Sequence, residues 1–183
     1  MVPLSKTLMN SLMLVAVALV LTACSADLGV YKAYIGDPRE DLQVARVNGG
    51  QIVRTDWINR YMDVVRFLTV DGMSIENPEE FNSIQIDPGY HELKVYFSWD
   101  LGSQRGLAPA LVDYAANRDT MSRDLRFNAL SGERYTVHAE PVFNPQGNSV
   151  TDLLYVDFWV EDREGNAIVS RESGRYVPRS ASR

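Results

Sequence analysis

Hydrophobic and polar side chains alternate with a period of two along most of the chain after residue 42. The stretches 93–99, 125–129, 135–139 and 154–160 place a hydrophobic or aromatic residue at every second position. This is the period of a β-strand with one buried face and one solvated face, because successive strand side chains point to opposite sides. The pattern therefore predicts half-buried strands rather than amphipathic helices.

Turn signals separate these stretches. They are Asn48-Gly49-Gly50, Asp71-Gly72, Asp87-Pro88-Gly89, Ser131-Gly132 and the polar run 162–166. Pro88 presets φ for the second turn position and Gly89 accepts a positive φ at the third, which predicts a type II turn. Eight or nine short strands at such spacing predict an all-β fold, an antiparallel β-sandwich. The exception is 107–118, where Pro109 favours a short helix and a long ordered loop is the alternative.

Three stretches carry a resemblance to a known group of proteins. They are the Asp71-Gly72 turn, residues 84–95 (IQIDPGYHELKV) and residues 131–137 (SGERYTV). In this order they resemble a broad group of uncharacterised bacterial lipoproteins that carry a PEGA-like β-domain. The resemblance covers residues 42–170, and its motifs consist of turn and strand chemistry. It therefore implies a fold and leaves the function open.

The first 23 residues differ from the rest of the chain. Lys6 supplies a positive charge, and residues 12–21 (LMLVAVALVL) form an apolar run with the length of a signal-peptide core. A membrane-spanning helix needs roughly 20 apolar residues, so this run is too short to cross comfortably. It ends in Leu21-Thr22-Ala23-Cys24, which resembles a lipobox. We expect a signal peptide at 1–23 and a lipid on Cys24; an ordinary signal peptide or a short anchor, with an incidental cysteine, is the alternative.

The lipobox resemblance implies an anchor of two or three acyl chains, enough for stable attachment to a membrane. Ser25, not aspartate, follows Cys24, and in lipoproteins of diderm bacteria this implies sorting to the outer membrane, facing the periplasm. We expect a lipidated tether at 24–41, the β-domain at 42–170 and a flexible basic tail at 171–183. Gly174 and Pro178 argue against a helix in that tail.

Composition narrows the classes of function. Without residues 1–23, which hold one lysine and no acids, 160 residues remain, with 17 basic and 24 acidic side chains. This acidic balance disfavours nucleic acid as a partner. Cys24 is the only cysteine, which excludes a disulfide framework and a thiolate metal site. We expect no cofactor and no metal.

Candidate catalytic groups are sparse. The chain has two histidines, His91 and His138, and no Gly-x-Ser-x-Gly elbow. The carboxylates of Asp157, Glu161 and Asp162 lie on the polar face of a strand and in the turn after it, where charges are usually solvated. We therefore predict no catalytic residues, and a carboxylate-dependent glycan hydrolase of the cell envelope is the alternative.

Aromatic residues are the strongest binding candidates. Tyr96, Tyr155 and Trp159 fall on strand faces opposite the predicted core, where exposed rings could stack on sugars or anchor a protein interface. Burial under a helix or loop is the competing explanation. The sequence thus predicts a non-enzymatic envelope accessory or interaction module, held to the membrane through Cys24, with an envelope protein or a glycan as partner.

Overall fold

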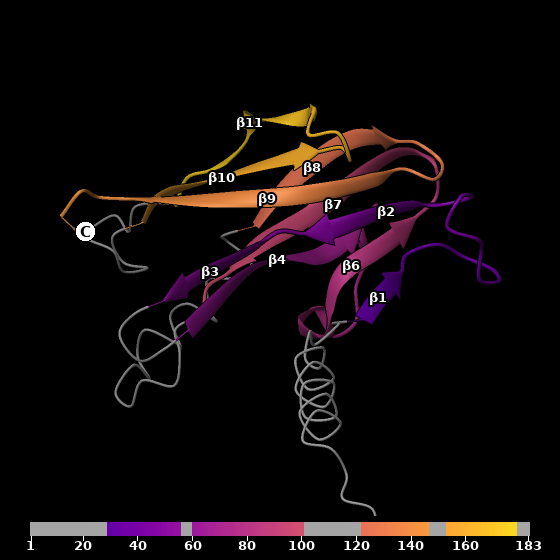
Figure 1. Cartoon of the computed structure of the whole chain (residues 1–183), viewed down its shortest axis with the longest axis horizontal. Coiled ribbons are helices and arrows are strands. Elements are labelled where there is room, and N and C mark those ends of the chain that lie inside the picture. The colour runs from indigo at the N-terminus through magenta and orange to yellow at the C-terminus, as the bar shows by residue number, and fades with distance from the viewer. Residues whose placement is uncertain (1–28, 56–59, 101–121, 147–152, 179–183) are drawn as a thin grey trace, which may run out of the picture.

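The computed structural model describes residues 29–55, 60–100, 122–146 and 153–178, and most of these lie in β-strands (Figure 1). The strands are β1 (Gly29–Lys32), β2 (Ala45–Gly49), β3 (Gln51–Thr55), β4 (Arg60–Val70), β5 (Met73–Ser74), β6 (Phe81–Ile86), β7 (Gly89–Ser98), β8 (Ser122–Ala129), β9 (Arg134–Phe143), β10 (Leu153–Glu161) and β11 (Ala167–Tyr176). A short 3₁₀ helix, η1 (Pro78–Glu80), precedes β6. The predicted all-β fold is confirmed, and the segment 107–118 lies outside the described residues.

The strands form two sheets that pack against each other (Figure 1). Sheet A has six strands in the order β1-β6-β2-β9-β10-β11, and sheet B has the order β3-β4-β7-β8 with β5 beside β4. Most neighbours are antiparallel, but β1 pairs with β6 and β2 pairs with β9 in parallel. Alternation could not reveal these two pairs, because parallel and antiparallel strands share the same period of two.

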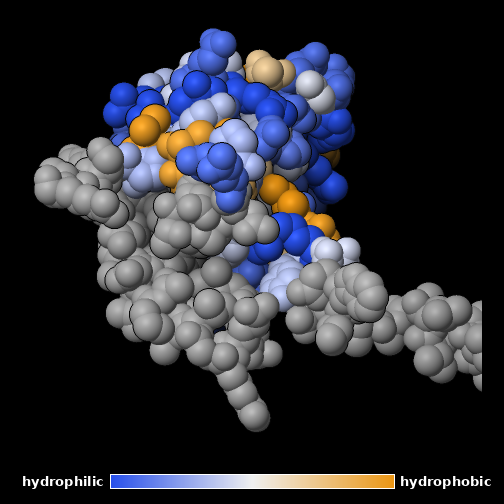
Figure 2. Space-filling view, turned by 90° about the vertical axis from the view of Figure 1, so that its left-hand side faces the viewer, coloured by the Kyte–Doolittle hydropathy of each residue, from blue (hydrophilic) through white to orange (hydrophobic). Residues whose placement is uncertain are grey.

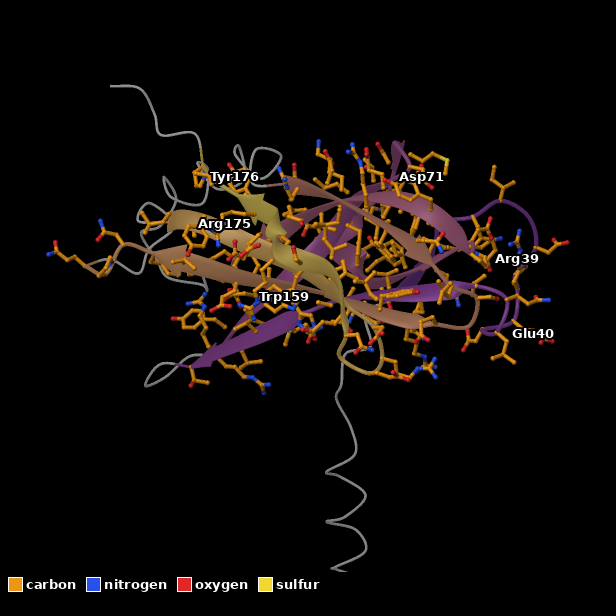
Figure 3. The ribbon with its side chains drawn as sticks, turned by 90° about the horizontal axis from the view of Figure 1, so that it is seen from above. Arg39, Glu40, Asp71, Trp159, Arg175 and Tyr176 are labelled. Carbon is orange, nitrogen blue, oxygen red and sulfur yellow. The ribbon has the colours of Figure 1, made fainter. Side chains whose placement is uncertain are left out.

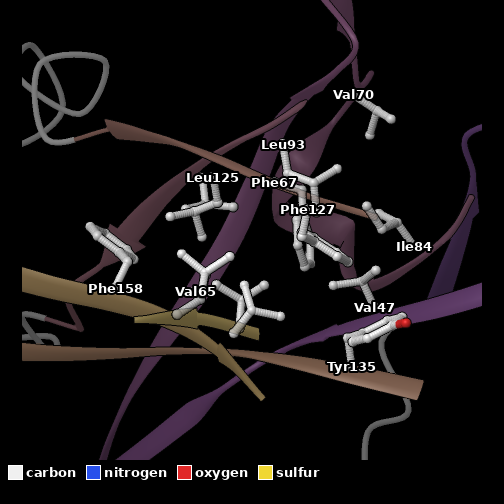
Figure 4. Close-up of a cluster of buried hydrophobic side chains, with 14 of the residues drawn as sticks. Val47, Val65, Phe67, Val70, Ile84, Leu93, Leu125, Phe127, Tyr135 and Phe158 are labelled. Atoms are coloured by element: carbon white, nitrogen blue, oxygen red, sulfur yellow. The ribbon is translucent and has the colours of Figure 1, made fainter. Parts of the chain in front are cut away.

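The core lies between the sheets and consists of the residues that alternation placed inward (Figure 4). Its largest members include Phe67, Leu93, Leu125 and Phe127 of sheet B, and Val47, Ile84, Tyr135 and Phe158 of sheet A. Burial of one such side chain stabilises the fold by about 1.5–3 kcal/mol. The polar end of Tyr135 is also satisfied, since its hydroxyl accepts a hydrogen bond from the Leu130 N–H at 3.0 Å.

Gly49 and Gly50 carry the chain from sheet A to sheet B, so the predicted turn at 48–50 is wrong. The Gly50 N–H donates to the Val137 carbonyl at 2.7 Å, and the Gly50 carbonyl accepts from the Val65 N–H at 2.9 Å. A Cβ atom on Gly49 would lie 2.1 Å from the Val65 carbonyl oxygen. Glycine is therefore required here by the close approach of two backbones rather than by turn geometry.

The Asp71-Gly72 hairpin is confirmed. Val70 pairs with Met73, and the two turn residues have φ angles of 51° and 79°, as a primed two-residue turn requires. Gly89 has a φ of 133°, which confirms the predicted positive φ. This angle is well above the roughly 80° of the third position of a type II turn, and Gly89 is already the first residue of β7, so the predicted turn type is wrong.

The turns at 87–88 and 130–133 differ from the prediction in another way. β6 and β7 lie in different sheets, and so do β8 and β9. These two turns therefore connect the sheets across one end of the sandwich, instead of closing hairpins within one sheet.

The sandwich extends further toward both chain ends than expected. Residues 29–32 of the predicted 24–41 tether form β1, which pairs with β6 at one edge of sheet A. Tyr34 is also buried, and its hydroxyl accepts a hydrogen bond from the Arg39 N–H at 3.1 Å. At the opposite edge β11 continues to Tyr176, so the first part of the predicted flexible tail at 171–183 is a strand. Both strands lack a clear apolar alternation, because each is an edge strand with mostly exposed residues.

Candidate functional site

The outer face of sheet A carries most of the polar and aromatic residues that the sequence indicated. Every second residue of β10, beginning with Val156, points into the core. The residues between them form the outward row Tyr155, Asp157, Trp159 and Glu161. Two of these are nevertheless almost covered, since Asp157 is 7% exposed and Trp159 is 9% exposed. Side chains of the neighbouring strands β9 and β11 provide the cover.

Trp159, labelled in Figure 3, lies on β10, which has β9 and β11 as its neighbours in the sheet. Its ring stacks on His138 of β9, with centroids 5.0 Å apart and an angle of 16° between the planes. The guanidinium carbon of Arg171 on β11 lies 3.7 Å from the ring centroid. The indole N–H donates to the Glu161 carboxylate at 2.8 Å. The ring is therefore a packing element that offers little free surface to a ligand.

Arg175 forms the second arginine contact on this face (Figure 3). Its Nε and Nη2 donate to the two carboxylate oxygens of Asp157 at 2.6 and 2.8 Å, and its guanidinium carbon lies 4.1 Å from the Tyr155 ring centroid. The hydrogen bond to Asp157 raises the pKa of Arg175 above its ordinary value. Half-buried Tyr155 thus presents a ring that already has a cation against it.

Two further polar contacts complete the arrangement. Arg171 pairs with Glu140 of β9, and His138 Nε2 lies 3.1 Å from a Glu161 carboxylate oxygen. We call this set of contacting side chains the β9–β11 ladder; its members are His138, Glu140, Tyr155, Asp157, Trp159, Glu161, Arg171 and Arg175.

The ladder holds an irregular edge strand to the sheet. Phe158 pairs with Gly174 and Val160 pairs with Val169, so residues 170–173 of β11 face a single residue of β10. Such a bulge interrupts the regular backbone pairing. Arg171 lies within it and Arg175 just beyond it, and both side chains reach back over β10. The ladder therefore supplies side-chain contacts where backbone contacts are lost.

Tyr96 lies elsewhere in the molecule. It belongs to β7 in sheet B, is 2% exposed, and its hydroxyl lies 3.2 Å from a Glu79 carboxylate oxygen. The structure thus brings Tyr155 and Trp159 onto one face but does not bring Tyr96 to them.

Hydrophobic surface is scattered on the end of the sandwich where β4 begins. Figure 2 views this end, and the described surface there is mostly hydrophilic, with hydrophobic atoms in small separate groups. Val53 and Met62 form a cross-strand pair near this end, and their exposed fractions are 44% and 41%. A polar face is therefore a better candidate site than a hydrophobic one at this end.

The three carboxylates of the hydrolase alternative all have partners. Asp157 accepts both hydrogen bonds from Arg175, and Glu161 accepts from Trp159. Asp162 accepts from the side-chain amide of Asn166 and from its backbone N–H, both at 2.8 Å. These hydrogen bonds lower the pKa of Asp162. A general acid needs the opposite shift, because it must keep its proton near neutral pH.

His91 joins two turns at the end of the sandwich where β7 begins. Its Nδ1 lies 2.6 Å from an Asp71 carboxylate oxygen, and its Nε2 lies 2.7 Å from the Asp87 carbonyl oxygen. Each ring nitrogen thus has a close oxygen atom, one from each turn. These two contacts make His91 a connection between the turns.

A pocket that the sequence pattern did not indicate opens where β2 and β9 begin. It has a volume of about 380 Å³ and is lined by Asp41, Leu42, Val44, Arg46, Gly132, Glu133, Arg134 and Arg163. We call it the arginine pocket. Its three arginines are far apart in the chain, and the parallel pairing of β2 with β9 brings two of them together. Alternation places Arg46 and Arg134 on outward faces, but only the pairing shows that these faces adjoin.

Across the ranges that the structure describes, no group of three or more His, Cys, Asp or Glu residues could hold a metal ion. In the same ranges no helix has the length and hydrophobicity to cross a membrane. Cys24, the predicted lipidation site, lies outside them.

No protein-family model matches this chain. Searches of curated proteins and of solved structures also find no match. Inference about function therefore rests on the sequence motifs and on the geometry of the outer face of sheet A.

Proposed function

We propose that this chain is a lipid-anchored module of the bacterial outer membrane that faces the periplasm and binds an envelope partner without catalysing a reaction. The lipobox at 21–24 supports the anchor at Cys24, and Ser25 after it supports the outer membrane. The partner is an envelope protein or a glycan. The acidic balance of the chain disfavours nucleic acid.

The positions and hydrogen-bond partners of the carboxylates on sheet A favour a binding module over a hydrolase. A glycosidase needs two carboxyl groups that face a shared space, roughly 5–10 Å apart. Asp157 and Glu161 are four residues apart on one strand, which separates their Cα atoms by roughly 13 Å. Trp159 lies between them and donates to Glu161. Both carboxylates already accept hydrogen bonds from side chains of the ladder, so their arrangement supports a structural role.

The outer face of sheet A is the candidate binding surface. It combines the ladder on β9, β10 and β11 with the arginine pocket at the start of β2 and β9. Its surface is rich in charged groups held in fixed positions. A surface of this kind recognises polar partners through hydrogen bonds and charge.

The anchor is tested by Cys24→Ser in cells given a palmitate analogue. Wild type is expected to take up the label and to stay in the membrane fraction, whereas the variant should lose both properties. Equal labelling of the two proteins would refute lipidation at Cys24.

The binding surface is tested by photo-crosslinking in intact cells. A photoreactive residue replaces Thr136, which lies on the outer face of sheet A, or Asp124, which is exposed on β8 of sheet B. Adducts of defined mass are expected from position 136 and not from position 124. Equal adducts from both positions, or adducts from 124 alone, would contradict the assignment of the surface.

The hydrolase alternative is tested with purified full-length protein and isolated peptidoglycan. No soluble glycan fragments are expected. Release of fragments by wild type, and loss of that release in Glu161→Gln, would replace the binding module with the hydrolase.

A further inference from the structure

We propose that the arginine pocket is a binding site for a phosphate group. This inference rests on the proposed binding surface, which it narrows to one pocket and one ligand chemistry, and it does not depend on the anchor. Three observations on the described residues support it: two neighbouring arginines that lack an ion-pairing carboxylate, a third arginine fixed at the rim, and walls that are held in place by hydrogen bonds.

Arg46 and Arg134 are direct neighbours on parallel strands. They are register partners in the β2–β9 pair. Their neighbours along the strands, Ala45, Val47 and Tyr135, belong to the core, so Arg46 and Arg134 point outward. Like charges at such positions destabilise a sheet. Arg46 Nε donates to the Ser83 hydroxyl at 3.1 Å. Within the described part of the chain, neither guanidinium has a carboxylate at ion-pairing distance.

Arg163 supplies the third cation from the turn between β10 and β11. Its Nη2 donates to the Gly132 carbonyl at 2.9 Å, and its Nε lies 3.4 Å from a Glu133 carboxylate oxygen. The same Glu133 oxygen accepts from the Arg134 backbone N–H at 2.8 Å, which keeps this carboxylate at the turn.

The second acid of the pocket is also engaged, since Asp41 accepts from the Gln85 amide at 3.2 Å. Three arginines and two acids leave the lining with one excess positive charge. A bound anion would neutralise this excess positive charge and reduce the repulsion between Arg46 and Arg134.

The walls of the pocket are fixed before any ligand arrives. The Gly132 N–H donates to the Val44 carbonyl at 2.9 Å, and the Arg46 N–H donates to the Glu133 carbonyl at 3.0 Å. The Ser131 hydroxyl donates to the Leu42 carbonyl at 2.6 Å. These bonds tie the segment before β2 to the turn before β9, so binding orders few additional backbone groups and loses less entropy.

The chemistry of the lining favours phosphate over carboxylate. A single arginine fork satisfies a planar carboxylate, whereas the oxygens of a phosphate point in several directions and suit donors from several elements. The pocket volume of about 380 Å³ is in the range of small-molecule sites. It is larger than the volume that a bare phosphate ion would fill. The phosphate is therefore carried by a small molecule or by a lipid headgroup. Leu42, 77% exposed at the rim, offers apolar contact to the remainder of either.

Calorimetric titration of full-length protein in non-ionic detergent tests the proposal. Inorganic phosphate and dihexanoyl phosphatidic acid are the two probes, and dihexanoyl phosphatidylcholine is the lipid control. Saturable binding of at least one phosphate probe is expected. Arg46→Gln and Arg134→Gln should each weaken it about tenfold or more, because each removes charged hydrogen bonds.

Arg60→Gln is the matched control for charge. Arg60 is exposed at the start of β4, at the other end of the sandwich, and has no ion-pairing partner among the described residues. Its binding curve should match wild type. Melting curves without phosphate verify folding, and Arg134→Gln should melt at or above the temperature of wild type.

The two probes distinguish the sources of phosphate. Similar affinity for both indicates a soluble phosphate compound, and at least tenfold tighter binding of the phosphatidic acid indicates a lipid headgroup. Absence of saturable binding of both probes would overturn the proposal. An equal loss of binding in Arg60→Gln would do the same, since it would show a general effect of net charge.

Discussion

Two groups of arginines lie on the outer face of sheet A and have opposite surroundings. Arg171 and Arg175 of the ladder each have a carboxylate partner and an aromatic ring. Arg46 and Arg134 of the arginine pocket have neither within the described ranges. The residue type and the sheet are the same, so the difference comes from the neighbours. An arginine whose charge is matched within the fold stabilises it, and one whose charge is unmatched is available to a ligand.

The pairing of strands explains this difference. On the antiparallel β9–β10–β11 side, acids and rings of one strand lie beside the cations of the next. On the parallel β2–β9 side, two arginines have the same register position. Mutations in the ladder should therefore cost more stability than mutations in the arginine pocket.

Trp159→Ala should cause the largest loss, about 3 kcal/mol in the free energy of unfolding. The ring is 9% exposed and lies between His138 and Arg171, so its removal leaves a space that these neighbours cannot fill. Urea denaturation measures the effect, and Trp159→Phe should lose less because a ring remains. A loss below about 0.5 kcal/mol, typical of an ordinary surface position, would show that the ladder is not a packing unit.

Asp157→Ala should lower the free energy of unfolding by about 2 kcal/mol, because it removes two charged hydrogen bonds at a site that is 7% exposed. A double-mutant cycle with Arg175→Ala measures the coupling between the two side chains. Additive effects of the two mutations would mean that the pair contributes no interaction energy of its own.

Acid should weaken the turn that contains Asp71. Burial works against ionisation of this carboxyl, but hydrogen bonds from the Glu92 N–H and from His91 outweigh it and lower the pKa of Asp71 below its ordinary 3.8. Since the folded pKa is the lower one, the stabilisation is complete above pH 3.8 and is lost as the pH falls through the folded value. Asp71→Asn should therefore show a smaller loss of stability over this acidic range, measured by denaturation at several pH values. An unchanged pH profile would contradict the assignment.

Arg134→Gln should have the smallest effect in phosphate-free buffer, within about 0.5 kcal/mol of wild type and in the stabilising direction. Arg175→Gln provides the contrast, because it breaks the bidentate pair with Asp157. Equal losses of stability in the two variants would show that Arg134 has an unrecognised structural partner, and the distinction between the two regions would fail.

Local patterns predicted the faces of the strands and the geometry of single turns. The alternation on β10 correctly separates Val156 from Asp157, and the Asp71-Gly72 and Gly89 backbone angles follow from residue type. These features depend on neighbours in the sequence. Local patterns failed at Gly49, where glycine is needed for a contact with Val65 across the sandwich.

The candidate site was predictable only in part, because it depends on which strands pair. Tyr155 and Trp159 were recognised as outward residues, but their cover by Arg175 and Arg171 requires the position of β11. The arginine pocket could not be predicted, since nothing near Arg46 in the sequence indicates that it lies beside Arg134. Pairing between distant segments is the information that a single sequence lacks.

The pairing of β1 with β6 also limits the distance between the sandwich and Cys24. β1 begins at Gly29, only five residues after Cys24, and an extended chain of that length spans roughly 18 Å. Six strands across sheet A add a width of roughly 24 Å from β1 to β11. The proposed lipid on Cys24 would therefore hold the domain close to the bilayer, so that a partner would meet it at the membrane surface.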